Sequence, residues 1–135
     1  MIRFLLDTDT LSNLVRRPHG TVAERVANIG AGSVATSIVV AAEIRFGLAK
    51  RPSKHLALNA AKVLSALTII PFESPADRFY ADLRADLERR GQSIGANDML
   101  IAAHALALDC TLVTGNEREF RRIAGLRVEN WLHGR

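Results

Sequence analysis

Acidic side chains beside apolar segments are the residues of this chain best suited to do chemistry. Asp7 directly follows the apolar run Phe4-Leu5-Leu6, and Glu43 lies inside a long apolar stretch. Asp98 lies in the first turn of a further apolar stretch, Asn97–Leu108. An ionised carboxylate costs roughly several kcal/mol to bury unless it is paired or bound to a metal. As a set, Asp7, Glu43 and Asp98 therefore predict a site for a divalent cation.

Each acid taken singly also has a purely structural explanation. Asp7 or Asp9 could cap the helix that follows, because Asp is a favourable N-cap residue. Asp9 has no assigned partner and is expected either to cap the helix or to support the metal ligands without contacting the metal itself. Glu43 could pair with Arg45 or lie exposed at a helix edge. Asp98 could simply interact with the dipole of its helix.

Further oxygen donors follow the fourth expected strand. Asn116 and Glu119 lie in the segment Thr114–Phe120, and either could complete the site. Ser37 and Thr114 stand at strand ends, where their hydroxyls could hydrogen-bond the carboxylates. Oxygen donors without a cysteine or paired-histidine motif suit a hard cation, Mg²⁺ or Mn²⁺. Such an ion activates water for attack on a phosphodiester and neutralises charge on the leaving oxygen.

Alternating strands and helices must position these residues. Strands are expected at Phe4–Leu6, Ser33–Thr36, Thr68–Ile70, Thr111–Thr114 and Arg127–Trp131. Helices are expected at Thr10–Val15, Thr21–Ile29 (with Thr21 as N-cap), Ile38–Ala49, Ser53–Leu67, Pro75–Arg90 and Asn97–Leu108, with a short one near Glu117–Ile123. This alternation predicts an α/β fold, a three-layer α/β/α domain with a mostly parallel central sheet of about five strands. Residues 1–135 are expected to form a single domain.

Composition and charge limit the possible partners. No apolar run approaches the roughly 20 residues of a membrane span, and no signal peptide is expected. The lone cysteine, Cys110, permits no internal disulfide and fits a reduced, cytoplasmic location. The net charge of +4 favours a polyanionic partner. Candidate RNA contacts are the basic residues Arg16, Arg17, Lys50, Arg51 and Lys54.

Three other conspicuous residues are expected to be structural. Cys110 reads as a small core residue, since free cysteine is commonly buried. His104 has no histidine or cysteine partner at metal-ligand spacing, so it is expected to pack within its apolar helix. Trp131 is expected to anchor the last strand.

The motifs as a set resemble the PIN-domain ribonucleases, and most closely the VapC-type toxins of bacterial type II toxin–antitoxin pairs. The matching stretches cover nearly the whole chain: FLLDTDTLSNL, TSIVVAAEIRFG, IGANDMLIAAHAL and LVTGNEREFRRIAGLRVENW. The family's acidic residues carry over to Asp7, Glu43 and Asp98. Its fourth acidic position falls after Thr114, where Asn116 replaces an aspartate, so that Asn116 or Glu119 would complete the site.

The resemblance implies an endoribonuclease that depends on Mg²⁺ or Mn²⁺ and leaves 5′-phosphate and 3′-hydroxyl ends. It implies tRNA as a substrate, cut in the anticodon loop, with initiator tRNA among the targets. It also implies a homodimer that a small VapB-like antitoxin neutralises by forming a toxin–antitoxin hetero-oligomer with it. No membrane partner is expected.

Two other functions fit parts of the sequence. A haloacid-dehalogenase-like phosphatase would use Asp7 as nucleophile and Asp9 as acid and base, although Leu11 replaces the Thr or Val of that motif. A non-catalytic RNA- or protein-binding domain could keep the fold without the chemistry. The carboxylates on apolar helices argue against it, because unused buried charges are costly.

Overall fold

A five-stranded sheet, in which every neighbouring pair of strands is parallel, forms the centre of the computed structural model, which describes residues 1–133. The strands are β1 (Phe4–Leu6), β2 (Val34–Ser37), β3 (Thr68–Ile70), β4 (Thr111–Val113) and β5 (Val128–Glu129). Their spatial order is β3-β2-β1-β4-β5. β1 is buried along its whole length, as expected of an apolar central strand covered on both faces.

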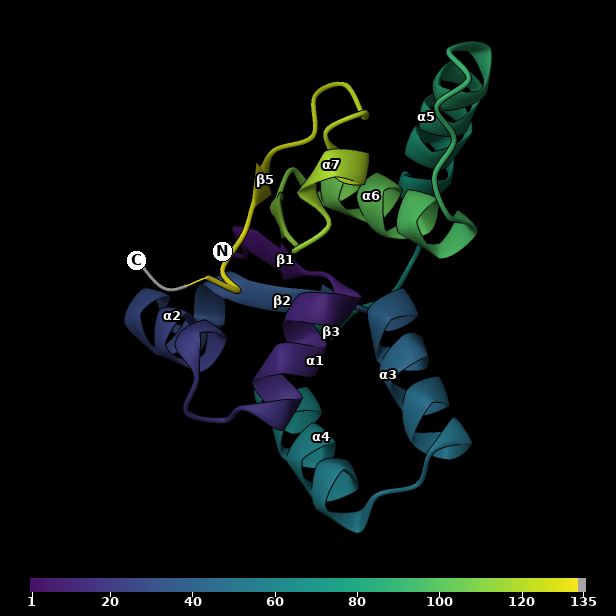
Figure 1. Ribbon diagram of the computed structural model, residues 1–135. Helices are drawn as coiled ribbons and strands as arrows, with labels where there is room; N and C mark the ends of the chain where they lie inside the picture. Colours follow the sequence, from purple (N-terminus) through teal and green to yellow (C-terminus); the bar gives the residue numbers. More distant parts are fainter. Residues whose placement is uncertain (134–135) are drawn as a thin grey trace.

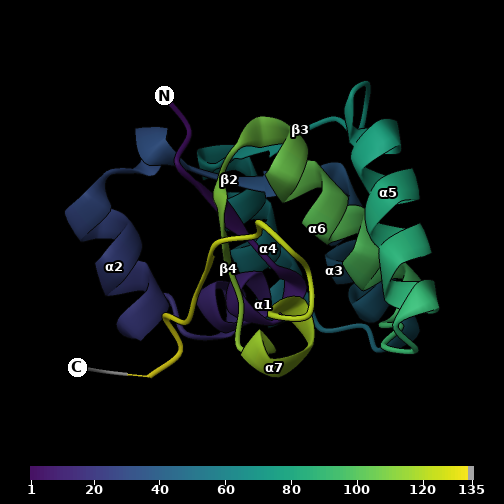
Figure 2. The same cartoon turned by 90° about the horizontal axis from the view of Figure 1, so that it is seen from above.

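Helices cover both faces of this sheet. They are α1 (Thr8–Arg16), α2 (Thr21–Ile29), α3 (Ile38–Lys50), α4 (Lys54–Ala66), α5 (Ala76–Arg89), α6 (Ala96–Leu108) and α7 (Glu117–Phe120), with a 3₁₀ turn at Ala31–Ser33. Figure 1 shows α1 and α4 on one side of the sheet and α5 and α6 on the other, and Figure 2 shows the same layers from above. The predicted three-layer α/β/α architecture is confirmed. No helix in the described part of the chain is long and apolar enough to cross a bilayer.

Helix caps account for several of the element boundaries. Ser37 caps α3 by accepting a hydrogen bond from the Val39 N–H at 3.0 Å, and Ser53 caps α4 in the same way. The predicted cap of α2 is wrong, because Gly20 takes the N-cap position and Thr21 is the first helical residue. The Thr21 hydroxyl instead donates to the carbonyls that follow β5.

The last strand is shorter than the predicted Arg127–Trp131. β5 ends at Glu129, and the Trp131 ring turns inward to pack on Phe4 of β1, with ring centroids 5.0 Å apart. Trp131 is buried and its indole N–H donates to Glu129. The tryptophan therefore anchors the last strand, as predicted. The expected single domain over residues 1–135 stays a prediction, and its last two residues lie outside the described range.

The strand order places the candidate residues at one edge of the sheet. From β1 the chain proceeds outward through β2 and β3, then crosses to β4 on the other side of β1. In open parallel sheets the crevice at such a reversal, beyond the carboxyl ends of the strands, is where ligands bind. Asp7 follows β1 and Thr114 follows β4, so these two residues flank the reversal point.

Candidate active site

Asp7 is a buried carboxylate with one oxygen left free. It follows β1, its N–H donates to the Val113 carbonyl at 2.9 Å, and its side chain is almost fully buried. Oδ2 accepts a hydrogen bond from the Thr114 hydroxyl at 2.7 Å, whereas Oδ1 has no partner among the described residues. Burial raises the pKa of Asp7 to about 7, against the opposing hydrogen bonds from Thr114 and the Thr8 N–H. A cation or water beside Oδ1 would satisfy this oxygen.

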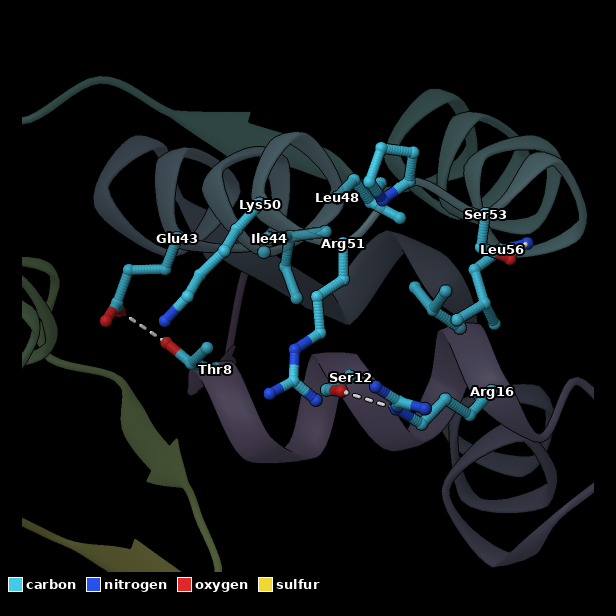
Figure 3. Close-up of a pocket in the computed structure, with 13 residues that line it drawn as sticks. Thr8, Ser12, Arg16, Glu43, Ile44, Leu48, Lys50, Arg51, Ser53 and Leu56 are labelled. Atoms are coloured by element: carbon cyan, nitrogen blue, oxygen red, sulfur yellow. Dashed lines mark hydrogen bonds between the residues drawn. The ribbon is translucent and has the colours of Figure 1, made fainter.

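Glu43 projects from α3 toward the start of α1 (Figure 3). Its Oε1 accepts a hydrogen bond from the Thr8 hydroxyl at 2.5 Å, and its Oε2 accepts one from the Asn97 side chain at 3.4 Å. Within residues 1–133 it forms no ion pair, so the alternative pairing with Arg45 is excluded there. The half-buried Glu43 thus joins three elements, α1, α3 and α6, at the sheet edge.

Asp98 lies in the first turn of α6 and faces other acids. Burial, which is the largest cause, and the nearby carboxylates of Glu43, Glu119 and Asp9 together raise its pKa to about 6. Among the residues that the structure describes, no hydrogen bond or cation counteracts these effects. The acids predicted from separate parts of the sequence therefore lie close enough to interact, and the negative charge of one makes ionisation of its neighbours less favourable.

Asp9 has a partner, contrary to the expectation from the sequence. Its Oδ2 accepts a hydrogen bond from the Gly115 N–H at 2.9 Å, and it raises the pKa of both Asp7 and Asp98. A Cβ at position 115 would lie 2.6 Å from Asp9 Oδ2 and would also overlap the Leu132 side chain. Glycine therefore allows the turn after β4 to approach Asp9, which belongs with the acidic cluster.

The segment after β4 supports the cluster through its side chains. The Asn116 N–H donates to Thr114 Oγ1 at 3.0 Å, while the Asn116 side-chain amide donates to Glu119 at 2.7 Å. Glu119 in turn acts on the pKa of Asp98. Asn116 is thus oriented toward Glu119, and Glu119 is the acid of this segment that influences the cluster.

The Ser37 hydroxyl contacts α3 and α6 and forms no hydrogen bond to a carboxylate among the described residues. Its hydroxyl lies between the Val39 N–H and His104 Nδ1, which is 2.8 Å away. This corrects the expectation that Ser37 hydrogen-bonds an acid, because its hydroxyl contacts the Val39 N–H of α3 and the His104 ring of α6. His104 is buried as predicted, and burial lowers its pKa.

The donor set fits a hard cation with water among its ligands. Among residues 1–133, no three acids, histidines or cysteines already surround a single point closely enough to ligate one ion. Mg²⁺ commonly takes only one or two carboxylates and keeps several waters. The free Oδ1 of Asp7 and the mutual repulsion of the acids both favour such an ion.

Two hollows meet at Glu43. One, of about 360 Å³, is lined by Glu43, Asp98 and the turn Gly95–Asn97. The other, of about 560 Å³, runs between α1 and α3 and is lined by Arg16, Lys50 and Arg51 among others (Figure 3). Two further candidate RNA contacts, Arg17 and Lys54, do not line either hollow, and their role stays a prediction.

Sequence reasoning missed the polar residues that orient the acids. Thr8 and Asn97 both hold Glu43, and each immediately adjoins a predicted ligand, Asp7 or Asp98. In the sequence, only this adjacency to a predicted ligand indicates a role for Thr8 and Asn97 at the site. A residue next to a ligand at a helix start commonly faces the same crevice, because the first turn is short.

Comparison with known proteins gives the family. The model of the PIN domain matches residues 4–126. Ribonuclease VapC2 of Rickettsia felis is 45% identical over 102 residues, which is 73% of this chain and 75% of that protein. The tRNA(fMet)-specific endonuclease VapC of Shigella flexneri is 33% identical, with 97% of this chain and 99% of that protein covered.

Solved structures agree with this assignment. The crystal structure of VapBC2 from Rickettsia felis, bound to a DNA fragment from its promoter, superposes with a TM-score of 0.89 at 34% identity, covering 97% of this chain and 99% of that chain. The crystal structure of DNA-bound VapBC from Salmonella typhimurium superposes with a TM-score of 0.85 at 31% identity. The match covers 97% of this chain and 99% of that chain. The chain belongs to the PIN-domain family and, within it, to the VapC ribonucleases. The resemblance is confirmed, and the phosphatase alternative has no support.

Proposed function

We propose that this chain is a metal-dependent endoribonuclease toxin that hydrolyses phosphodiester bonds of RNA. The observation that carries the proposal is Asp7, a buried carboxylate whose Oδ1 has no partner among the described residues and whose pKa is raised by the charge of Asp98. A purely structural aspartate would have both oxygens hydrogen-bonded, because leaving a buried polar atom unpaired costs about 1 to 3 kcal/mol. The ribonuclease names of the relatives support the same reading.

The proposed metal ligands are Asp7, Glu43 and Asp98, with Asn116 and Glu119 as auxiliary residues. When bound, Mg²⁺ or Mn²⁺ would supply an activated water for attack on phosphorus and positive charge for the leaving oxygen. Thr114 holds one oxygen of Asp7 and leaves the other available. Thr8 and Asn97 hold the two oxygens of Glu43, so that the acids keep their positions at the edge of the sheet.

The proposed substrate is tRNA, cut in its anticodon loop. The relatives from Shigella flexneri and Salmonella typhimurium are named tRNA(fMet)-specific endonucleases. An unpaired loop can splay its backbone into the hollow between Glu43 and Asp98, which a duplex cannot do. The net charge of +4 attracts the phosphate backbone.

The proposed partner is a VapB-like antitoxin. The solved relatives from Rickettsia felis and Salmonella typhimurium are described as VapBC and were crystallised on DNA. We propose a homodimer that joins a toxin–antitoxin hetero-oligomer of this kind in the cytoplasm, where its RNA substrate is found.

Incubation of the purified protein with unfractionated tRNA tests the function. We expect cleavage with Mg²⁺ or Mn²⁺, none with EDTA, and loss of cleavage in Asp98→Asn. Asp109→Asn removes an acid at the exposed far end of α6 and serves as the matched control. Cleavage by Asp98→Asn at the wild-type rate would contradict the assignment of the site.

A further inference from the structure

A groove with cationic walls extends from the candidate active site along α1 and α3. Its volume is about 560 Å³. Figure 3 shows Lys50 and Arg51 reaching from α3 toward α1, while Arg16 extends from α1 back toward Ser12. We call this feature the basic groove. It is defined by Arg16, Lys50 and Arg51 on its walls and by the apolar residues Val15, Ile44 and Leu56.

The two helices place their cations at matched positions along the groove. Arg16 follows Thr8 by eight residues, and Arg51 follows Glu43 by eight residues. A helix rises about 1.5 Å per residue, and residues seven or eight apart share one broad face of it. Arg51 directly follows the last residue of α3. The backbone positions of Arg16 and Arg51 therefore lie roughly 12 Å along the helices from those of Thr8 and Glu43. The Lys50 side chain extends back toward Thr8 and Glu43 (Figure 3). The basic groove thus has Glu43 at one end and cations along its walls.

The cations of the basic groove are not used for ion pairs within residues 1–133. Arg16 donates only to the Ser12 hydroxyl, at 3.3 Å, and Lys50 lies 6.0 Å from the Phe46 ring centre. Elsewhere in the described chain, arginines such as Arg84 and Arg121 pair with an acid one turn away. The charges in the groove are thus available to an anionic ligand.

We infer that the basic groove binds the phosphates of the RNA strand on one side of the cleaved bond. The inference rests on the proposed function. Glu43 lines both the hollow that contains Asp98 and the basic groove, so a strand whose scissile phosphate lies beside Asp98 continues into the groove. Its next phosphates then meet Lys50 and Arg51, and the apolar floor contacts ribose and base faces.

Gly47 keeps the floor of the basic groove open. It lies one turn after Glu43 on α3, and a Cβ built there meets no atom within 4 Å. The Cβ of a larger side chain at this lining position would therefore meet none of the protein's own atoms. Because glycine is about 1 kcal/mol less favourable than alanine inside a helix, a substitution there is also compatible with folding.

Removal of charge tests the inference directly. In an Asp98→Asn background, which isolates binding from cleavage, the double variant Lys50→Gln/Arg51→Gln should bind unfractionated tRNA about tenfold more weakly and lower the slope of log K against log salt by about two. The variant Arg45→Gln/Lys62→Gln removes the same two charge types from exposed positions of α3 and α4 outside the groove. It should leave affinity within about twofold.

The outcomes separate the two proposals. If the protein with native Asp98 cleaves RNA but both double variants bind alike, the groove inference is overturned and the function stands. If that protein cleaves no RNA while the charge variants still differ, the function fails and the groove remains an RNA site. If Lys50→Gln/Arg51→Gln lost binding to an acidic amphipathic peptide but bound tRNA as before, the inference would be overturned, and the groove would be a peptide-binding site.

A steric variant provides a second test. Gly47→Leu should raise KM for tRNA at least about tenfold, leave kcat within about twofold and keep or raise the melting temperature. Ala49→Leu places the same side chain on an exposed part of α3 outside the groove and should leave KM unchanged. An unchanged KM in Gly47→Leu would overturn the inference, because the groove would then carry no strand.

Discussion

At the scale of single residues, the two oxygens of Asp7 have different environments. One accepts a hydrogen bond from Thr114 at 2.7 Å, and the other has no partner in the described chain. Burial raises the pKa of this carboxyl to about 7, and Thr114 provides the largest opposing effect. The threonine therefore keeps Asp7 closer to the charged form that binds a cation.

Thr114→Val removes this hydrogen bond while preserving side-chain shape. We expect the pKa of Asp7 to rise further and the metal affinity or activity to fall about ten- to a hundredfold, as is usual when a residue that orients a ligand is lost. Thr114→Ser keeps the hydroxyl and should retain most activity. The Mg²⁺ concentration for half-maximal tRNA cleavage measures the effect, and equal values for Val and Ser variants would contradict it.

Asp7→Asn should stabilise the metal-free protein at high pH. In the unfolded chain Asp7 loses its proton near pH 3.8, but in the folded chain it does so at about 7. Between these values the folded state binds more protons, so the free energy of unfolding of the wild type falls as pH rises. Asparagine does not titrate. The advantage of the variant should therefore grow across this window, to at most about 4 kcal/mol.

Urea unfolding in EDTA at about pH 5 and about pH 8 measures this difference. Asp98, whose pKa is raised to about 6, shifts stability in the same direction in both proteins. Asp109→Asn is the control at an exposed site. The same stability increment for Asp7→Asn at both pH values would show that burial does not perturb Asp7.

Much of the acidic cluster could be predicted from sequence, and the reason is burial. Asp7, Glu43 and Asp98 stand out because charged residues beside apolar runs are costly. Asp9 could not be placed in this way, since its partner Gly115 lies 106 residues away and donates a backbone N–H. A backbone donor leaves no trace in side-chain type, so only the folded turn after β4 reveals the contact.

At the scale of elements, the start of α3 is secured twice by Ser37. The hydroxyl caps the helix and also contacts His104 of α6 at 2.8 Å. Ser53 caps α4 at 3.2 Å, but within residues 1–133 its hydroxyl forms no hydrogen bond to a second element. Ser37 therefore ties the helix that carries Glu43 to the helix that carries Asp98.

Ser37→Ala should destabilise the protein more than Ser53→Ala. Loss of a cap alone costs about 1 kcal/mol, whereas Ser37→Ala also leaves a buried histidine nitrogen unpaired, which adds about 1 to 3 kcal/mol. Urea unfolding at neutral pH compares the two matched variants. Equal losses of stability would show that the contact between Ser37 and His104 contributes nothing.

The elements themselves could be read from apolar periodicity, but their ends and order could not. The helix after β1 begins at Thr8 and not at Thr10, because Asp7 already takes the extended N-cap conformation. The order β3-β2-β1-β4-β5 depends on long-range pairing between strands of two to four residues. Such short strands carry too little pattern to specify which neighbours they choose.

At the scale of the whole molecule, the fold gathers acids at one edge of the sheet and cations along one groove. The sheet reversal between β1 and β4 brings Asp7 close to the turn that holds Asp9, and α6 adds Asp98. The three acids repel one another, as their effects on the pKa values of Asp7 and Asp98 show. A cation that neutralises this repulsion binds the folded state more tightly, since the unfolded chain separates Asp98 from Asp7 and Asp9.

Mg²⁺ should therefore raise the melting temperature of the wild type. At a concentration about ten times Kd the gain is about 1.4 kcal/mol, or roughly 3 to 6 °C for a chain of this size. Asp7→Asn should melt higher than wild type in EDTA yet gain less from Mg²⁺, and Asp109→Asn should respond like wild type. Calorimetry with and without Mg²⁺ measures both quantities. If Mg²⁺ raised the melting temperature of Asp7→Asn as much as that of the wild type, Asp7 would not be a metal ligand. If Mg²⁺ did not raise the melting temperature of the wild type, the acids would not converge on a metal.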